Sequence, residues 1–202
     1  MIPAPVHLLP FLAVSMLVVV TPGVDMALVT KNAMLHGRSA ARATALGVNL
    51  GIFIWTLAAA LGLAAVVAAS AAAFTAIKLL GALYLVYLGV RVLLGSHEPR
   101  VVIARGSAFR QGLVSNLLNP KIAVFFTSLL PQFVDADHAQ PQDLLLLGLL
   151  FNCLGVVWLL IYGDLAARGR NLLRRPRVKR ALDRVTGVAL VGLGVRLAFE
   201  RR

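Results

Sequence analysis

The fold class follows from apolar runs such as LLLLGLLFNCLGVVWLLIYGDLAA, residues 144–167, in which Asp164 is the one charged side chain. About 20 apolar residues in a helix cross the hydrocarbon core of a bilayer. Further runs of this kind occupy residues 6–30, 43–66, 73–94, 112–134 and 182–199. All are expected to be helices, because a backbone exposed to lipid must satisfy its own hydrogen bonds. The sequence therefore predicts an all-α, polytopic membrane protein with about six transmembrane helices.

The composition supports this class and excludes a water-soluble enzyme. The chain has 202 residues, of which 59% are hydrophobic and 14% are charged, and its mean hydropathy is +0.86. A soluble domain is about a quarter charged, so this chain has too few polar residues to cover a water-soluble surface. The length suits a single transmembrane domain over residues 1–202.

Lysine and arginine are distributed unevenly among the loops between the apolar runs. The first, third and fifth loops hold 15 of the 20 Lys and Arg residues, whereas the second and fourth hold none. Basic residues accumulate on the cytoplasmic side of membrane proteins, so the odd loops are predicted to be cytoplasmic. Six spans would then place both termini outside. The basic residues Arg196, Arg201 and Arg202 oppose this, and five full spans are the alternative.

Several partners and cofactors are not expected. The net charge of +12 lies in short loops, which indicates a topology signal against an anionic lipid bilayer and not a nucleic-acid partner. One cysteine, Cys153, excludes an intramolecular disulfide. The four histidines lie near span ends or in loops, and the chain has no Walker loop or HExxH motif. Neither a metal ion nor a cofactor is therefore expected.

Two halves of the chain share short features in the same order. The third span ends with LGVR at 88–91 and the sixth with LGVR at 193–196. Because each half would contain three spans, an odd number, the two halves would have opposite orientations in the membrane. The pattern predicts an inverted repeat of residues 1–95 and 106–202. Chance recurrence in apolar sequence is the alternative.

The first span contains a predicted helix break with an acidic residue beside it. Pro22 has no N–H, so the carbonyl of Val18 loses its helical partner, and Gly23 loosens the helix further. Irregular backbone at membrane depth is tolerated only beside a cavity or packed protein. Asp25 follows, about one and a half turns from the predicted cytoplasmic end. A carboxylate inside a span indicates a function or a partner.

The fourth span contains a second break, at Asn116-Leu117-Leu118-Asn119-Pro120-Lys121. Pro120 frees the carbonyl of Asn116, and Asn116 and Asn119 share one helix face because they are three residues apart. Lys121 lies about nine residues into the predicted span, or roughly 13 Å, too deep for its ammonium to reach the membrane surface easily. It is expected to face a cavity or a counter-ion.

On this topology Asp25 and Lys121 both fall in the cytoplasmic half of the membrane, and we expect them to face one cavity. Exposed carbonyls suit an ammonium group and helix N-termini suit a carboxylate, so the two breaks predict a zwitterion site. The residues expected to bind substrate or couple transport are Pro22, Gly23, Asp25, Asn116, Asn119, Pro120 and Lys121. The alternative is that Asp25 and Lys121 only neutralise one another.

Other small or polar residues in the spans carry weaker signals. Gly47 and Gly51 form a GxxxG pattern, which favours close helix packing within one chain or in a homo-oligomer. Asp164 is expected to pair with Arg168, one helical turn away. Asn152 is expected to line the pathway or to bond a neighbouring helix.

These residues resemble the lysine exporter (LysE/RhtB) family of bacterial amino-acid exporters. Residues 21–25, TPGVD, are similar to that family's Pro-Gly-Pro-Asp signature, with Val24 in place of the second proline, so a milder break is expected. The most specific match comprises Phe109-Arg110-Gln111-Gly112, then 116–121, then Phe125-Phe126 and Pro131-Gln132-Phe133-Val134.

The resemblance covers essentially the whole chain. It implies a multi-pass exporter of amino acids or their derivatives in the bacterial cytoplasmic membrane, driven by the membrane gradient and not an enzyme. A proton carried by Asp25 is the expected coupling. An exporter of another small solute, a membrane-embedded enzyme and a non-transporting scaffold are the alternatives. The exported amino acid, the coupling ion and the oligomeric state stay open.

Overall fold

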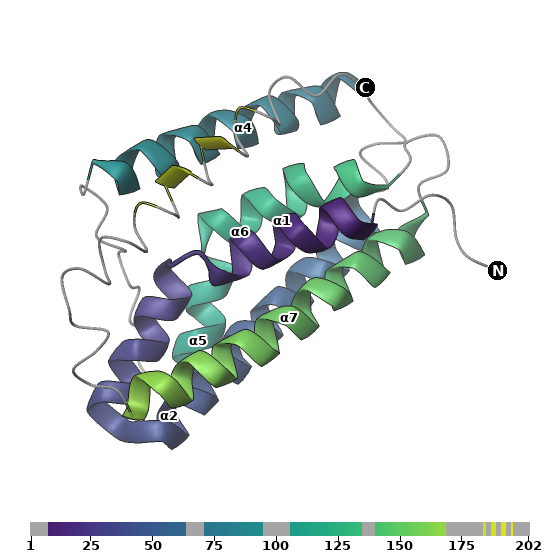
Figure 1. Ribbon diagram of the computed structural model, residues 1–202. Helices are drawn as coiled ribbons and strands as arrows, with labels where there is room; N and C mark the ends of the chain where they lie inside the picture. The colour runs from purple at the N-terminus through teal and green to yellow at the C-terminus, as the bar shows by residue number, and fades with distance from the viewer. Residues whose placement is uncertain are drawn as a thin grey trace.

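The computed structural model describes residues 8–63, 71–94, 106–134 and 140–168, with the single positions Arg184, Gly187, Val188, Val191, Gly192 and Val195. Every regular element within these residues is a helix, which confirms the all-α class (Figure 1). The elements in chain order are α1 (Leu8–Val20), α2 (Val24–Ala58), η1 (Ala59–Leu63), α4 (Ala71–Leu93), α5 (Ala108–Leu117), α6 (Pro120–Val124), η2 (Phe125–Leu129), η3 (Leu130–Phe133) and α7 (Pro141–Arg168). The predicted span 182–199 lies largely outside the described residues.

Apolar helices of membrane-spanning length are present. Val24–Gly62 and Pro141–Arg168 are each long and apolar enough to cross a bilayer, and the pair Ala108–Leu117 and Pro120–Phe133, bent by 48°, makes a third unit of this kind. The apolar helix α1 has 13 residues, about 20 Å of helix, which is too short to cross alone. It therefore completes a span only together with the beginning of α2.

The chain reverses direction inside α2, at Gly37. Gly37 has φ 82° and ψ −170°, a backbone conformation that glycine adopts without steric cost. Asn32 Nδ2 donates to Thr44 Oγ1 at 2.8 Å, although residues 12 apart in a straight helix lie about 18 Å apart. Residues 24–36 and 38–58 therefore lie side by side, as the path of α2 in Figure 1 shows.

This reversal corrects the predicted end of the first span. The span was expected to end at residue 30, but the helix continues to residue 36, and the predicted first loop is reduced to the turn at Gly37. Lys31 thus belongs to a helix and not to a loop. A prediction from hydropathy places the end of a span where polar residues begin. A helix can continue through such residues.

The corrected boundaries place both helix breaks at the middle of their spans. Pro22 is the midpoint of residues 8–36, and the break before Pro120 is the midpoint of 108–133. Asp25 and Lys121 therefore lie near the centre of their spans. That they lie in the cytoplasmic half of the membrane stays a prediction, because the helix ends alone do not place the bilayer.

Glycines let α2 and α5 approach very closely. A Cβ added at Gly112 would overlap the carbonyl oxygen of Thr44, and one added at Gly47 would overlap that of Phe109. The two helices therefore touch backbone to backbone, as small residues in membrane helices allow. The GxxxG pattern at Gly47 and Gly51 packs against α5 of the same chain.

A second line of glycines joins α7 to α2. Gly155 faces the side chain of Asn49, and Gly163 faces that of Ala41. Beside them, Asn152 Nδ2 donates to the backbone oxygen of Asn49 at 3.1 Å. Of the two roles predicted for Asn152, the bond to a neighbouring helix is confirmed.

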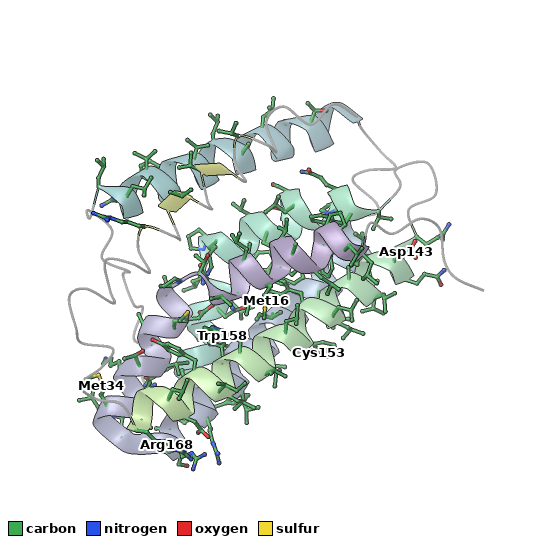
Figure 2. All side chains as sticks on the ribbon, viewed as in Figure 1. Met16, Met34, Asp143, Cys153, Trp158 and Arg168 are labelled. Atoms are coloured by element: carbon green, nitrogen blue, oxygen red, sulfur yellow. The ribbon has the colours of Figure 1, made fainter. Side chains whose placement is uncertain are left out.

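The two ends of the helix bundle differ in charge. Figure 2 shows Met34 and Arg168 together at one end and Asp143 at the opposite end. The reversal at Gly37 lies at the end of Met34 and Arg168, with Arg38 and Arg42 just after it along α2. This basic end is the one predicted to be cytoplasmic.

An ion-pair cluster fastens α2 to the end of α7. Asp164 accepts hydrogen bonds from Arg38 Nε at 2.6 Å and from Arg42 Nε and Nη2 at 3.0 Å each. The predicted pair of Asp164 with Arg168 was therefore wrong. The reversal of α2 brings two guanidinium groups to this carboxylate, and spacing along α7 alone could not show them.

Replacing Gly112 tests the backbone contact between α2 and α5. Gly112→Ala is expected to destabilise the protein by about 1–3 kcal/mol, because an overpacked interior has to shift its backbone. The measurement is the Tm of the purified protein in detergent. Gly62→Ala is the control, since a Cβ there meets nothing within 4 Å. Equal Tm values for the two variants would contradict the close contact.

Candidate functional site

A three-residue break, Thr21–Gly23, separates α1 from α2. The N–H and the Oγ1 of Thr21 both donate to the carbonyl oxygen of Leu17, at 3.1 and 2.6 Å, and this ends α1. Because Pro22 carries no N–H, the carbonyl of Val18 has no helical donor, as the sequence predicted. The break therefore leaves backbone acceptors exposed in the middle of the span.

The carboxylate of Asp25 is the centre of the site. It lies in the first turn of α2 and is 8% exposed. It accepts hydrogen bonds from Asn116 Nδ2 and Asn119 Nδ2, each at 2.9 Å, and from Ser115 Oγ at 3.4 Å. A helix N-terminus also stabilises negative charge. These donors make a buried carboxylate tolerable at this depth.

Asn119 connects the carboxylate to the second break. Its Oδ1 accepts from the backbone N–H of Lys121 at 3.0 Å and so caps the N-terminus of α6, while its Nδ2 donates to Asp25. Pro120 occupies the first turn of α6, where a missing N–H costs nothing. One asparagine side chain therefore begins α6 and holds the carboxylate.

The ammonium of Lys121 supplies hydrogen-bond donors to the backbone carbonyls at the first break. Lys121 Nζ donates to the carbonyl oxygens of Val18 and Thr21, at 3.2 and 3.1 Å. A Cβ at Gly23 would lie 3.2 Å from Nζ, so the glycine leaves space for the ammonium. Although both residues lie in the described part of the chain, no ion pair joins Lys121 to Asp25. The two charges therefore do not touch, and the alternative that they only neutralise one another, across the space between them, stays a prediction.

Asp25 and Lys121 nevertheless line one cavity, as predicted. The cavity lies between α1, α2, α6 and α7, and its volume is about 30 Å³. That is room for a water molecule or two, but not for an amino acid. The remaining lining residues are Val18, Val19, Gly23, Met26, Val48, Ile52, Ile122, Phe151, Gly155 and Leu159.

The helices around this cavity carry two clusters of different chemistry, and one of them contributes Phe151 to the lining. Toward the basic end, Asn32 Nδ2 donates to Thr44 Oγ1 at 2.8 Å and to Gln111 Oε1 at 3.3 Å, which makes a polar layer between α2 and α5. In the second cluster, Phe125 stacks on Phe151 with 4.2 Å between ring centroids. We call Asn32, Thr44 and Gln111 the amide layer. We call the stacked rings of Phe125 and Phe151 the aromatic cluster.

The structure brings the predicted site residues together at one crossing of two broken spans. These are Pro22, Gly23, Asp25, Asn116, Asn119, Pro120 and Lys121. Sequence reasoning missed Ser115 and the amide layer. The signal for Ser115 was its spacing, since it precedes Asn119 by four residues on the same helix face. Within the described residues, no three His, Cys, Asp or Glu side chains are grouped so that they could hold a metal ion.

Comparison with known proteins gives relatives along nearly the whole chain. The chain is 32% identical to the uncharacterized membrane protein YrhP of Bacillus subtilis, over 96% of this chain and 99% of that protein. It is 29% identical to the homoserine/homoserine lactone efflux protein of Salmonella typhimurium, over 95% of each. It is also 29% identical to the threonine efflux protein of Escherichia coli, over 95% of this chain and 98% of that protein. No solved structure matches.

The family model described as LysE type translocator matches residues 16–201. This is nearly the whole chain, and it includes both helix breaks and all seven predicted site residues. The resemblance seen in the sequence is confirmed: the chain belongs to the LysE type translocator family.

Proposed function

We propose that this protein exports amino acids or small amino-acid derivatives across the bacterial cytoplasmic membrane, by secondary transport coupled to the proton gradient. The observation that carries the proposal is that a carboxylate and an ammonium line one cavity without touching, each beside a helix break. Two relatives, a homoserine/homoserine lactone efflux protein and a threonine efflux protein, support the same substrate class.

The two charged groups suit a zwitterion. Asp25 and the exposed carbonyls of the first break accept hydrogen bonds, and the ammonium of Lys121 donates them. An amino acid presents an ammonium and a carboxylate a few ångströms apart, so it can satisfy both kinds of group at once. The rest of the lining is apolar, as is usual for small-molecule sites.

Asp25 is the group that we propose to carry the coupling proton. The other polar groups that hold it, Ser115, Asn116 and Asn119, stay neutral at all physiological pH values. Asp25 is therefore the member of this cluster that can change its charge by exchanging a proton. Ionisable residues inside membrane spans commonly serve proton relays.

The orientation and the symmetry belong to the same proposal. In this proposal the basic end of the bundle faces the cytoplasm. The chain crosses the membrane several times, and its second and fourth loops lie outside. The two breaks lie at the middle of the first and fourth spans, which supports an inverted repeat of residues 1–95 and 106–202. In such transporters the substrate lies at the membrane midplane, where the discontinuous helices meet.

Removing the charge of Asp25 tests the function. Cells that express the protein are loaded with a panel of amino acids and dipeptides, and the appearance of each compound outside is measured. The wild-type protein is expected to speed the release of at least one amino acid. Asp25→Asn is expected to reduce that release to the level of cells without the protein, because the variant carries no proton.

Asp143→Asn is the matched control, because Asp143 lies at the far end of α7 and its side chain accepts from the backbone N–H of Gln140. It should export at the wild-type rate. Both variants are checked for equal amounts in the membrane. No accelerated release of any compound by the wild-type protein would overturn the exporter assignment, and full activity of Asp25→Asn would remove the proposed coupling role.

Two substitutions of Asn119 separate its two contacts. Asn119→Ser keeps an oxygen to cap α6 but loses the amide donor to Asp25, whereas Asn119→Ala loses both. The cap should be worth about 1 kcal/mol, so the alanine variant is expected to unfold at a lower denaturant concentration than the serine variant. Export should fail in both. Wild-type export by Asn119→Ser would show that the amide donor to Asp25 is dispensable.

A further inference from the structure

The resting position of Lys121 is unusual for a group that binds substrate. Its ammonium has three N–H donors, and two of them point to the carbonyls of Val18 and Thr21. These carbonyls are acceptors of the protein's own broken helix. The ammonium thus occupies the kind of acceptor site that a substrate ammonium would seek.

This position is weakly held compared with what a carboxylate offers. A hydrogen bond from an ammonium to a carboxylate adds the attraction of two opposite charges, which a bond from the same ammonium to a neutral acceptor lacks. Backbone carbonyls are neutral, so a substrate carboxylate that enters the cavity is the better acceptor for Lys121. The Lys121 side chain is flexible, and Gly23 places no side chain against its Nζ.

We propose that Lys121 makes the site select substrates with a free carboxylate, and that its bonds to the Val18 and Thr21 carbonyls are the resting position from which that carboxylate withdraws it. The carbonyls vacated in this exchange then accept from the ammonium of the substrate, next to Asp25. The ammonium of the substrate therefore replaces the ammonium of Lys121 at these two carbonyls. This inference rests on the proposed function.

The exchange also explains why Lys121 and Asp25 do not pair in the structure. A direct pair would leave the Val18 carbonyl without a donor, since Pro22 cannot supply one. An unsatisfied backbone group in a membrane interior costs several kcal/mol. With Lys121 on the carbonyls and neutral donors on Asp25, both breaks are satisfied until a zwitterion arrives.

The test compares an amino acid with its carboxamide, which keeps the ammonium but lacks the negative charge. The full-length protein is reconstituted in liposomes, and exchange of L-threonine and of L-threoninamide is measured, with the best amino acid of the panel and its amide as a second pair. Wild-type protein is expected to exchange the amino acid at least about tenfold faster than the amide, because a site built for a polar group rejects analogues that lack it.

Lys121→Met removes the charge but keeps a long, unbranched side chain. It is expected to lower exchange of the amino acid about tenfold more than exchange of the amide, so that the preference for the amino acid disappears. Lys121→Arg should keep the preference. Lys31→Met is the matched control, because Lys31 lies in α2 away from the cavity lining, and it should match the wild type.

The outcomes separate this inference from the proposed function. Exchange of no amino acid by the wild-type protein would overturn the proposed function, and this inference with it. Exchange by the wild type with a preference that survives in Lys121→Met would overturn the selection by Lys121 alone. A preference that disappears only in Lys121→Met supports it. A merely structural role of Lys121 would lower both rates together.

Discussion

The buried carboxylate of Asp25 constrains the arrangement of the whole bundle. Removing a carboxylate from water costs several kcal/mol unless hydrogen bonds replace the water. Here the donors all come from the fourth span, from Ser115, Asn116 and Asn119. That span must therefore cross the first one at its break. Gly47 and Gly112 have no side chain, and this lets α5 lie directly against α2.

Each helix break supplies what the other lacks. A helix that ends leaves carbonyls without donors, and a helix that begins leaves N–H groups without acceptors. Lys121, from the second break, donates to the carbonyls of the first, and Asp25, from the first, accepts from the asparagines of the second. Neither break would be stable in a bilayer without its counterpart. A change in charge at one break therefore alters the hydrogen bonds of the other.

Much of this was visible in the sequence, because prolines and charges inside apolar runs have few physical explanations. The breaks at Pro22 and Pro120 and the meeting of Asp25 with Lys121 at one cavity were predicted. The span ends were not, since hydropathy ends a helix where polar residues begin and only the positive φ of Gly37 ends it in fact. The partners of Asp164 were missed for the same reason: Arg38 and Arg42 reach it through the reversal at Gly37, and no spacing rule along one helix describes such a contact.

The amide layer and the aromatic cluster differ in what it would cost to separate their members. The aromatic cluster buries its rings, Phe125 and Phe151, completely or nearly so, and separating them would expose apolar surface. The amide layer of Asn32, Thr44 and Gln111 is held by side-chain hydrogen bonds, and water can replace these at little enthalpic cost. A cavity of about 30 Å³ has to widen before it admits an amino acid. Separating the amide layer therefore costs less than separating the aromatic cluster, and the amide layer is the one that lies toward the basic end of the bundle.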